Sequence, residues 1–393
     1  MNISDFQNIP SAKHNGLKQS INYLRCPISE VALREMSNDE LQELNYRISN
    51  NEIKQHDGMH LKRPLHAGLI SLNEQYVYPI EEDIFILLAS NAIDRFQEFS
   101  SDASDNSLSP TKKNVQNFYD EFGWQKDETG LHLDTASFTD TRPVVENYGH
   151  KCHLRVNKYL ESAGAYLLDI ASGAIPHAEY LTYSEKFDFR ICVDFSLLAL
   201  KEAKQKLGDK GIYILGDITN IPLVDDAMDA VISLHTIYHV PEDEQSKAFS
   251  EIHRVLKPGA SAVVVYTWSY SLFMDITYLP IRLVNKISRN IKKISHFMNA
   301  SSSNLDTSVK SSDAQISLYF RPQNYEWFHK KIKHICNHVD IYVWKSVNTR
   351  FLNIYIHSGL LGEKILELIY WLEDKFPYLA GRFGQYPLFL IKK

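Results

Sequence analysis

The chain has 393 residues, of which 44% are hydrophobic, and a formal net charge of −6. This length and hydrophobic content suffice for two or three domains with their own cores, and the negative charge disfavours nucleic acid as a partner, because nucleic-acid binders present a basic surface. We expect a cytoplasmic protein, since no secretory signal is visible and no apolar stretch reaches the roughly 18 residues that could span a bilayer. Neither a disulfide framework nor a zinc site is expected from the four widely separated cysteines, Cys26, Cys152, Cys192 and Cys336.

The first part of the chain is predicted to be a small separate unit. A polar tail covers residues 1–20, and the unit covers 21–95, opening with YLRCPISEVAL and closing with QYVYPIEEDIFILL. Residues 96–112 contain many Ser and Asp, which is typical of a linker. The two ends of the unit resemble the small zinc-ribbon family that includes a methyltransferase activator subunit.

The resemblance to the zinc-ribbon family is partial. Cys26-Pro27 and Tyr78-Pro79-Ile80 match its motifs, but Ser29 stands at the second knuckle position. A structural zinc site needs four ligands, and the nearby histidines lie in a polar insertion where we expect them to be solvated: His56, His60 and His66. The resemblance therefore implies a metal-free α+β ribbon-like domain that docks on or stabilises the next domain; a spacer is the alternative.

Three short apolar runs follow the linker, and each ends in an acid. The runs YLLD, FRICVD and IYILGD carry Asp169, Asp194 and Asp217, which are 25 and 23 residues apart. A polar stretch long enough for a crossover helix follows each run, which predicts successive βα units and a buried parallel sheet. Since the carboxyl ends of parallel strands share one edge, the three carboxylates should converge on one crevice.

Two more units extend the predicted sheet. DAVISLHTIYHV (229–240) predicts a fourth strand, EQSKAFSEIHRVL a helix, and KPGASAVVVYTW a turn and a fifth strand. The turn Lys257-Pro258-Gly259 should end the helix.

Together these motifs resemble those of a class I S-adenosylmethionine-dependent methyltransferase, over about residues 113–270. The matching segments are Asp169-Ile170-Ala171-Ser172-Gly173, Asp194, Gly216-Asp217-Ile218 with Ile221-Pro222, Asp229-Ala230-Val231 and Val255 to Gly259. The resemblance implies a Rossmann-like sheet of seven strands, mostly parallel with an antiparallel last strand, flanked by helices. It also implies S-adenosylmethionine as the cofactor.

Residue roles follow from this resemblance. Asp194 would accept hydrogen bonds from the ribose hydroxyls, and Asp217 from the adenine amino group. Gly173 would let the backbone approach the cofactor, while Asp169 would hold the loop and the methionine end. The remaining expected cofactor contacts are Ala171, Phe195, Ile218 and, from a Tyr-Asp segment that precedes the first strand, Tyr119.

A dinucleotide-binding oxidoreductase is the main alternative, because it also places an acid after its second strand. Its pyrophosphate needs free backbone N–H groups in a Gly-rich loop, whereas Ala171, Gly173 and Pro176 occupy the corresponding positions and proline has no N–H. Ala171 and Ile175 also replace glycines common in methyltransferases. A scaffold that keeps the fold without the chemistry therefore stays open.

Methyl transfer needs alignment of acceptor and methyl group above all, and a base only for acceptors that must lose a proton. His235 is placed for that role after the fourth strand, with His239 behind it. The tract His150 to His153 is not expected to bind a metal, because adjacent side chains on a helix face different ways.

The remaining chain should select the acceptor. Residues 271–320 are predicted to form a helical cap and a flexible Ser/Asn-rich stretch; the basic segment 276–298 either covers the acceptor pocket or touches an anionic membrane surface. Residues 321–393 should complete the sheet, with a helical insertion, LGEKILELIYWLEDKF, that packs on the core or forms a homodimer face. Four aromatic residues are candidates to line the acceptor pocket: Trp327, Trp344, Tyr355 and Trp371.

The sequence thus predicts an α/β enzyme that transfers a methyl group from S-adenosylmethionine to a small-molecule or glycan-related acceptor. Oxygen is the expected acceptor atom, because His235 offers a base.

Overall fold

The computed structural model describes residues 19–61, 63–96, 108–128, 130–133, 137, 139–280, 282 and 318–393. Most of the predicted polar tail, most of the predicted linker, the Ser/Asn-rich stretch and most of the basic segment 276–298 lie outside these described residues. The described start of the predicted cap is α8 (Leu272–Thr277). Within the described ranges, no helix is long and apolar enough to cross a membrane.

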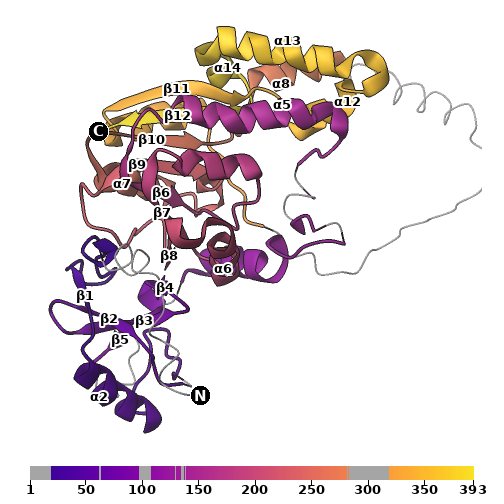
Figure 1. The fold of residues 1–393 in the computed structure, drawn as a ribbon. Coiled ribbons are helices and arrows are strands. Elements are labelled where there is room, and N and C mark those ends of the chain that lie inside the picture. The colour runs from indigo at the N-terminus through magenta and orange to yellow at the C-terminus, as the bar shows by residue number, and fades with distance from the viewer. Residues whose placement is uncertain are drawn as a thin grey trace, which may run out of the picture.

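Twelve strands of the described residues form one sheet (Figure 1). Its order is β1-β2-β3-β4-β8-β7-β6-β9-β10-β12-β11, with β5 beside β3. The strands β8, β7, β6, β9 and β10 are parallel, and β12 runs antiparallel to its two neighbours, β10 and β11. These strands are β6 (Gly164–Ile170), β7 (Phe187–Asp194), β8 (Gly211–Leu215), β9 (Met228–Leu234), β10 (Leu256–Val265), β11 (His338–Lys345) and β12 (Tyr386–Lys392).

The central strands are apolar on both faces because helices cover both sides of the sheet. In β7, Ile191 and Val193 belong to one core, while Cys192 belongs to the core on the opposite face. The helices and short helical turns of this part are α3 (Pro110–Phe118), η3 (Tyr119–Gly123), α5 (Pro143–Leu154), η4 (Arg155–Lys158), η5 (Ala178–Ser184), α6 (Leu197–Leu207), η6 (Gly208–Lys210), η7 (Ile237–His239) and α7 (Gln245–Val255).

The predicted linker ends earlier than expected. Ser109 caps α3 by accepting a hydrogen bond from the Lys112 amide, and Pro110 takes the first helical position, where its missing N–H costs nothing. Lys112 therefore belongs to a helix and not to a linker.

The N-terminal unit joins the same sheet. Its elements are β1 (Leu33–Glu35), α2 (Asn38–Ser49), β2 (Gly68–Ser71), β3 (Tyr76–Glu81), β4 (Ile84–Ile86), η2 (Ala89–Asn91) and β5 (Ile93–Asp94). β4 pairs in parallel with β8, with Phe85 opposite Ile214. The prediction of a seven-stranded sheet is therefore wrong, because β4 satisfies the free edge of β8 and continues the sheet into the N-terminal unit.

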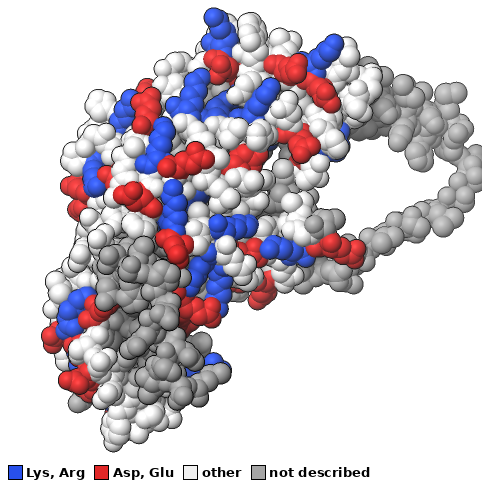
Figure 2. Space-filling model, in the orientation of Figure 1, with Lys and Arg blue, Asp and Glu red and all other residues white. Residues whose placement is uncertain are grey.

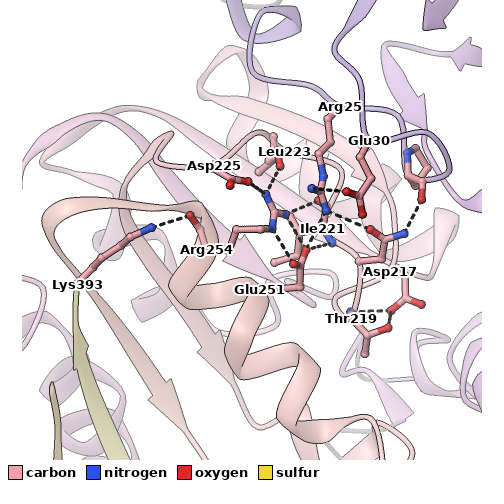
Figure 3. A network of polar contacts seen from close by, with 12 residues as sticks. Arg25, Glu30, Asp217, Thr219, Ile221, Leu223, Asp225, Glu251, Arg254 and Lys393 are labelled. Carbon is pink, nitrogen blue, oxygen red and sulfur yellow. Dashed lines mark hydrogen bonds and ion pairs between the residues drawn. The ribbon is translucent and has the colours of Figure 1, made fainter. Parts of the chain in front are cut away.

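A polar network fixes the N-terminal unit to the loop after β8 (Figure 3). Asn220 Nδ2 donates to the Pro27 carbonyl at 2.7 Å, and the Arg25 amide donates to the Pro222 carbonyl at 3.1 Å. The Arg25 guanidinium lies 3.6 Å from Glu251, which also pairs with Arg254 at 2.6 Å. The loop that begins at Asp217 is thus held from both sides.

At the predicted knuckle, Cys26 is fully buried, and its Sγ lies 3.2 Å from the Tyr78 hydroxyl. The Ser29 amide donates to the same Sγ at 3.3 Å. Tyr78 thus supplies a polar partner to the thiol. His60 and His66 are exposed as expected, whereas His56 is half-buried because it packs edge-on against Tyr76.

The C-terminal part supplies the outer strands and a helical layer above them (Figure 1). α14 packs on β11, and α13 packs on α5. The elements are α10 (Tyr325–Trp327), η8 (Phe328–Ile332), α11 (Lys333–Ile335), α12 (Thr349–Tyr355), η9 (Ser358–Leu360), α13 (Gly362–Lys375) and α14 (Pro377–Phe383). On the face seen in Figure 2, basic and acidic side chains of the described residues are interspersed, unlike the continuous basic band of a nucleic-acid binder.

Candidate functional site

A cavity of about 1220 Å³ opens at the carboxyl edge of the parallel strands. Its lining includes all ten residues predicted to bind the cofactor or to act in catalysis: Tyr119, Asp169, Ala171, Gly173, Asp194, Phe195, Asp217, Ile218, His235 and His239. The convergence expected from the strand ends is therefore present, although the role of each residue stays a prediction.

The strands contribute to this cavity in the order in which they lie in the sheet. From one end to the other, the lining residues at the strand ends are Asp217 after β8, Asp194 on β7, Asp169 on β6, His235 after β9, Thr267 after β10, Tyr386 on β12 and Lys345 on β11. Carboxylates occupy the β8–β6 half, which we call the acidic half. Histidine, aromatic and lysine side chains occupy the β9–β11 half, which we call the basic half.

Asp194 is the carboxylate best placed to receive a ligand with two hydroxyl groups. It is 7% exposed, and its two oxygens accept hydrogen bonds from the Gly173 and Ser196 amides, both at 2.8 Å. Each oxygen keeps a second lone pair for another donor. Burial raises the pKa of Asp194 to about 6, because water no longer solvates the charge, while the two amides act in the opposite direction.

The backbone of the loop after β6 is open to close approach by a ligand. Gly173 has φ +55°, and a Cβ there would overlap the Trp124 ring. Ala171 and Ile175, where related loops carry glycine, also adopt φ of 51°. A non-glycine residue in this left-handed region is strained by about 1–2 kcal/mol. The loop therefore adopts the backbone conformation that glycine favours although two of its positions are not glycine.

Asp169 is neutralised inside the protein. Its Oδ2 accepts from Arg190 Nε at 3.1 Å and from a terminal Arg190 nitrogen at 2.5 Å. Both side chains are buried, so the pair fixes the end of β6 and the start of the loop.

Asp217 has a partner that the sequence did not reveal. Lys112 Nζ lies 2.8 Å from Asp217 Oδ2 and 2.5 Å from Glu244. The other Asp217 oxygen accepts from the amide and hydroxyl of Thr219, both at 2.8 Å. One lone pair of Asp217 Oδ2 therefore remains for an adenine amino group.

A short aromatic segment closes the cavity over the loop. Tyr119 lies in η3 and stacks on Trp124, with ring centroids 5.5 Å apart. Asp120 accepts from the Ser196 hydroxyl at 2.5 Å, and the Phe195 carbonyl accepts from Gln116 at 2.9 Å, which ties the segment to the end of β7. This arrangement agrees with a segment that folds over a ligand held by Asp194.

The two candidate histidines are neutral. His235 packs edge-on against Trp344 with centroids 4.3 Å apart, and burial, with the nearby Lys345, lowers its pKa to about 3. His239 donates from Nδ1 to the Tyr319 carbonyl at 2.7 Å, which leaves Nε2 as an acceptor. Burial lowers its pKa to about 4.

Three further residues in the basic half were not singled out as site residues: His153, His177 and Lys345. Of the four aromatic candidates, Trp344 lines the cavity. Trp371 is exposed, Trp327 packs near Phe249, and Tyr355 bonds the Thr277 carbonyl. Among the residues that the structure describes, no group of three His, Cys, Asp or Glu side chains could hold a metal ion.

Residues 168–264 match a family model described as a methyltransferase domain. The predicted methyltransferase domain is thereby confirmed for this segment, with S-adenosylmethionine as the cofactor of such domains. The matched segment contains the strand-end residues Asp169, Asp194, Asp217 and His235.

Known proteins with similar sequences are methyltransferases. A demethylmenaquinone methyltransferase of Renibacterium salmoninarum is 34% identical over 31% of this chain and 46% of its own length. A sterol 24-C-methyltransferase of Gibberella zeae is 24% identical over 50% of this chain and 51% of its own. A solved structure of a SAM-dependent methyltransferase from Archaeoglobus fulgidus has 16% identity and a TM-score of 0.39, covering 66% of this chain and 98% of that one. The chain thus spans about half, or less, of the length of these curated relatives.

Proposed function

We propose that the chain is an S-adenosylmethionine-dependent methyltransferase that acts on a small molecule. The observation that carries this proposal is the acidic half of the cavity, where three strand-end carboxylates and a tight loop line one wall inside a segment that matches a methyltransferase domain. The cofactor would supply the methyl group from its sulfonium, and the protein would hold and align the two reactants.

The side chains fit such a cofactor. Asp194 has lone pairs for two ribose hydroxyls, and Asp217 keeps one for the adenine amino group beside Ile218. Gly173 offers a wall without a side chain, and the buried Trp124 Nε1 beside it has no hydrogen-bond partner among the described residues. Asp169 acts through Arg190 and positions the loop.

The acceptor atom is a separate question. A base with a pKa near 3 or 4 is poorly matched to deprotonating a hydroxyl at neutral pH, so His235 and His239 give little support to the oxygen acceptor expected from the sequence. We propose instead that their neutral nitrogens accept hydrogen bonds and orient the acceptor. Two relatives are named as a demethylmenaquinone methyltransferase and a sterol 24-C-methyltransferase, and neither name indicates an oxygen acceptor.

The alternatives make different predictions. An oxidoreductase would bind NADH, but Pro176 lines the cavity beside the loop where a pyrophosphate would need an N–H donor. A non-catalytic scaffold, which keeps the methyltransferase fold without the chemistry, would bind the cofactor but transfer no methyl group.

Isothermal titration of the full chain with S-adenosylmethionine, S-adenosylhomocysteine and NADH tests the proposal. Binding of the adenosyl ligands alone, followed by methyl transfer in an acceptor screen, is the expected result. Heat with NADH alone would overturn it in favour of the oxidoreductase, and binding without turnover would indicate the scaffold. His235→Ala should spare cofactor binding and slow transfer.

For the N-terminal unit, we propose a supporting role. Its contacts with Asn220 and Pro222 fix the loop that presents Asp217 and Ile218. The unit thus stabilises the adenine end of the cavity from outside it.

A further inference from the structure

The basic half of the cavity contains a half-buried lysine that forms no ion pair among the described residues. Lys345 lines the cavity, and within the described ranges its Nζ has neither a hydrogen bond nor an ion pair. It lies 5.1 Å from the centre of the Trp344 ring and 5.2 Å from that of Tyr386. Burial lowers the pKa of Lys345, and the nearby charges of Glu373 and Asp140 offset this only in part. The contacts that reach the ammonium are the two aromatic faces.

Three histidines surround this lysine without compensating it. The His153 and His177 rings lie 4.2 Å apart, and the charge of Lys345 helps to lower the pKa of His153, His177 and His235. His153 Nδ1 is buried and has no hydrogen-bond partner among the described residues, although its ring faces the cavity wall. A buried imidazole nitrogen without a partner costs about 1–3 kcal/mol, so this group is expected to have a ligand.

The other charges around the cavity explain why the missing partner is an anion. Asp217 is paired with Lys112, Asp140 with Arg142, and Asp169 with Arg190. Glu373, the other acid whose charge reaches Lys345, is likewise paired with Arg155. Asp140 and Glu373 thus act on Lys345 without forming an ion pair with it, and Asp194 lies in the acidic half.

The backbone directs this lysine into the cavity. The pairing of β11 with β12 shifts by one residue between Val343 and Lys345, so that Trp344 is a bulge. Successive side chains of a regular strand point to opposite faces, whereas a bulge redirects them. Trp344 and Lys345 therefore both line the cavity.

We propose that the basic half of the cavity is a subsite for an oxyanion carried by the methyl acceptor, a carboxylate or a phosphate monoester, with Lys345 as its main ligand and His153, His177 and His235 as hydrogen-bond partners. The inference rests on the proposed methyltransferase function and names the class of its acceptor. The acceptor lies with its anion at β11 and its reactive atom toward the cofactor at β6.

The test is calorimetric titration of the full chain, saturated with S-adenosylhomocysteine, with inorganic phosphate and with acetate at constant ionic strength. Lys345→Met keeps the length and apolar stem of the side chain but removes the charge. It should weaken binding of the preferred anion at least about tenfold, as expected for loss of a charged hydrogen bond. Lys364→Gln, which removes one exposed lysine from α13, should change nothing, and His177→Gln should weaken binding less than Lys345→Met.

The outcomes separate the two proposals. Tighter binding of phosphate indicates a phosphate monoester, and tighter binding of acetate a carboxylic acid; both support the subsite. If S-adenosylhomocysteine binds but neither anion does, or if Lys345→Met binds both as well as the wild type, the subsite is wrong and the methyltransferase proposal stands. If Lys345→Met weakens S-adenosylhomocysteine but not 5′-methylthioadenosine, the lysine holds the carboxylate of the cofactor, which also overturns the inference. Failure of S-adenosylhomocysteine to bind the wild type would instead refute the proposed function.

Discussion

The ionisation of Asp194 should control cofactor binding. Burial raises its pKa from 3.8 to about 6, so folding favours the protonated form, and this contribution to stability is lost as pH rises from about 4 to 6. The shift corresponds to roughly 3 kcal/mol. Ribose hydroxyls donate hydrogen bonds and therefore prefer the carboxylate. With a pKa near 6, about a tenth of the protein is ionised at pH 5 and about nine tenths at pH 7, so S-adenosylhomocysteine should bind about tenfold more weakly at pH 5.

Asp194→Asn removes the charge of this side chain but keeps its size, and so tests what the charge contributes to cofactor binding. Two hydrogen bonds to a charged acceptor are worth about 1.5–3 kcal/mol each, so binding should weaken at least about a hundredfold. The remaining affinity should no longer depend on pH in this range. Asp188→Asn is the matched control, because Asp188 is exposed near the opposite end of β7. Calorimetric titration from pH 5 to 8 gives both quantities; an equal pH slope in wild type and Asp194→Asn would refute the reasoning.

Three further changes test the cavity wall and its support. Lys112→Met leaves Asp217 without its cation and should lower the free energy of unfolding, measured by urea titration, by about 1–3 kcal/mol. It should also weaken the binding of S-adenosylhomocysteine. An unchanged free energy of unfolding would show that the contact does not stabilise the protein. Gly173→Ala adds backbone strain of about 1 kcal/mol at positive φ and places a Cβ against the Trp124 ring. Cofactor affinity should therefore fall and tryptophan fluorescence should change. An unaltered emission spectrum would contradict this packing. Arg25→Ala should speed hydrogen exchange in the loop 217–225 without affecting α13, and equal rates would argue against the supporting role of the N-terminal unit.

The acidic half was predictable because its signals are local. Asp169 and Asp194 end apolar runs whose length and spacing predict strands, and parallel strands bring such ends together. The shape of the loop could be inferred as well: Ala171 and Ile175 stand where glycine is common, and both adopt positive φ. In each case, the information lies within a few residues of the group concerned.

The partners of these residues could not be predicted, because they come from distant segments. Lys112 stands 105 residues before Asp217 and lies in a stretch whose composition is typical of a linker. The pairing of β4 with β8 joins two short apolar runs, and neither run reveals which edge it will occupy. Lys345 reaches the cavity through a bulge, and periodicity alone assigns it to one face of a regular strand.

The charges of the two halves bear on the reaction as well as on binding. Transfer from a sulfonium to a neutral acceptor moves a positive charge from the acidic half toward Lys345. Two unit charges about 4 Å apart interact by roughly 4 kcal/mol at an effective dielectric constant of 20, so even half of this repulsion from Lys345 would oppose the transfer by a factor of about 30. An acceptor that carries its own anion removes this opposition when it binds, because the anion neutralises Lys345 before the methyl group moves. Lys345, which has no ion-pair partner among the described residues, would therefore discriminate against neutral acceptors in the chemical step.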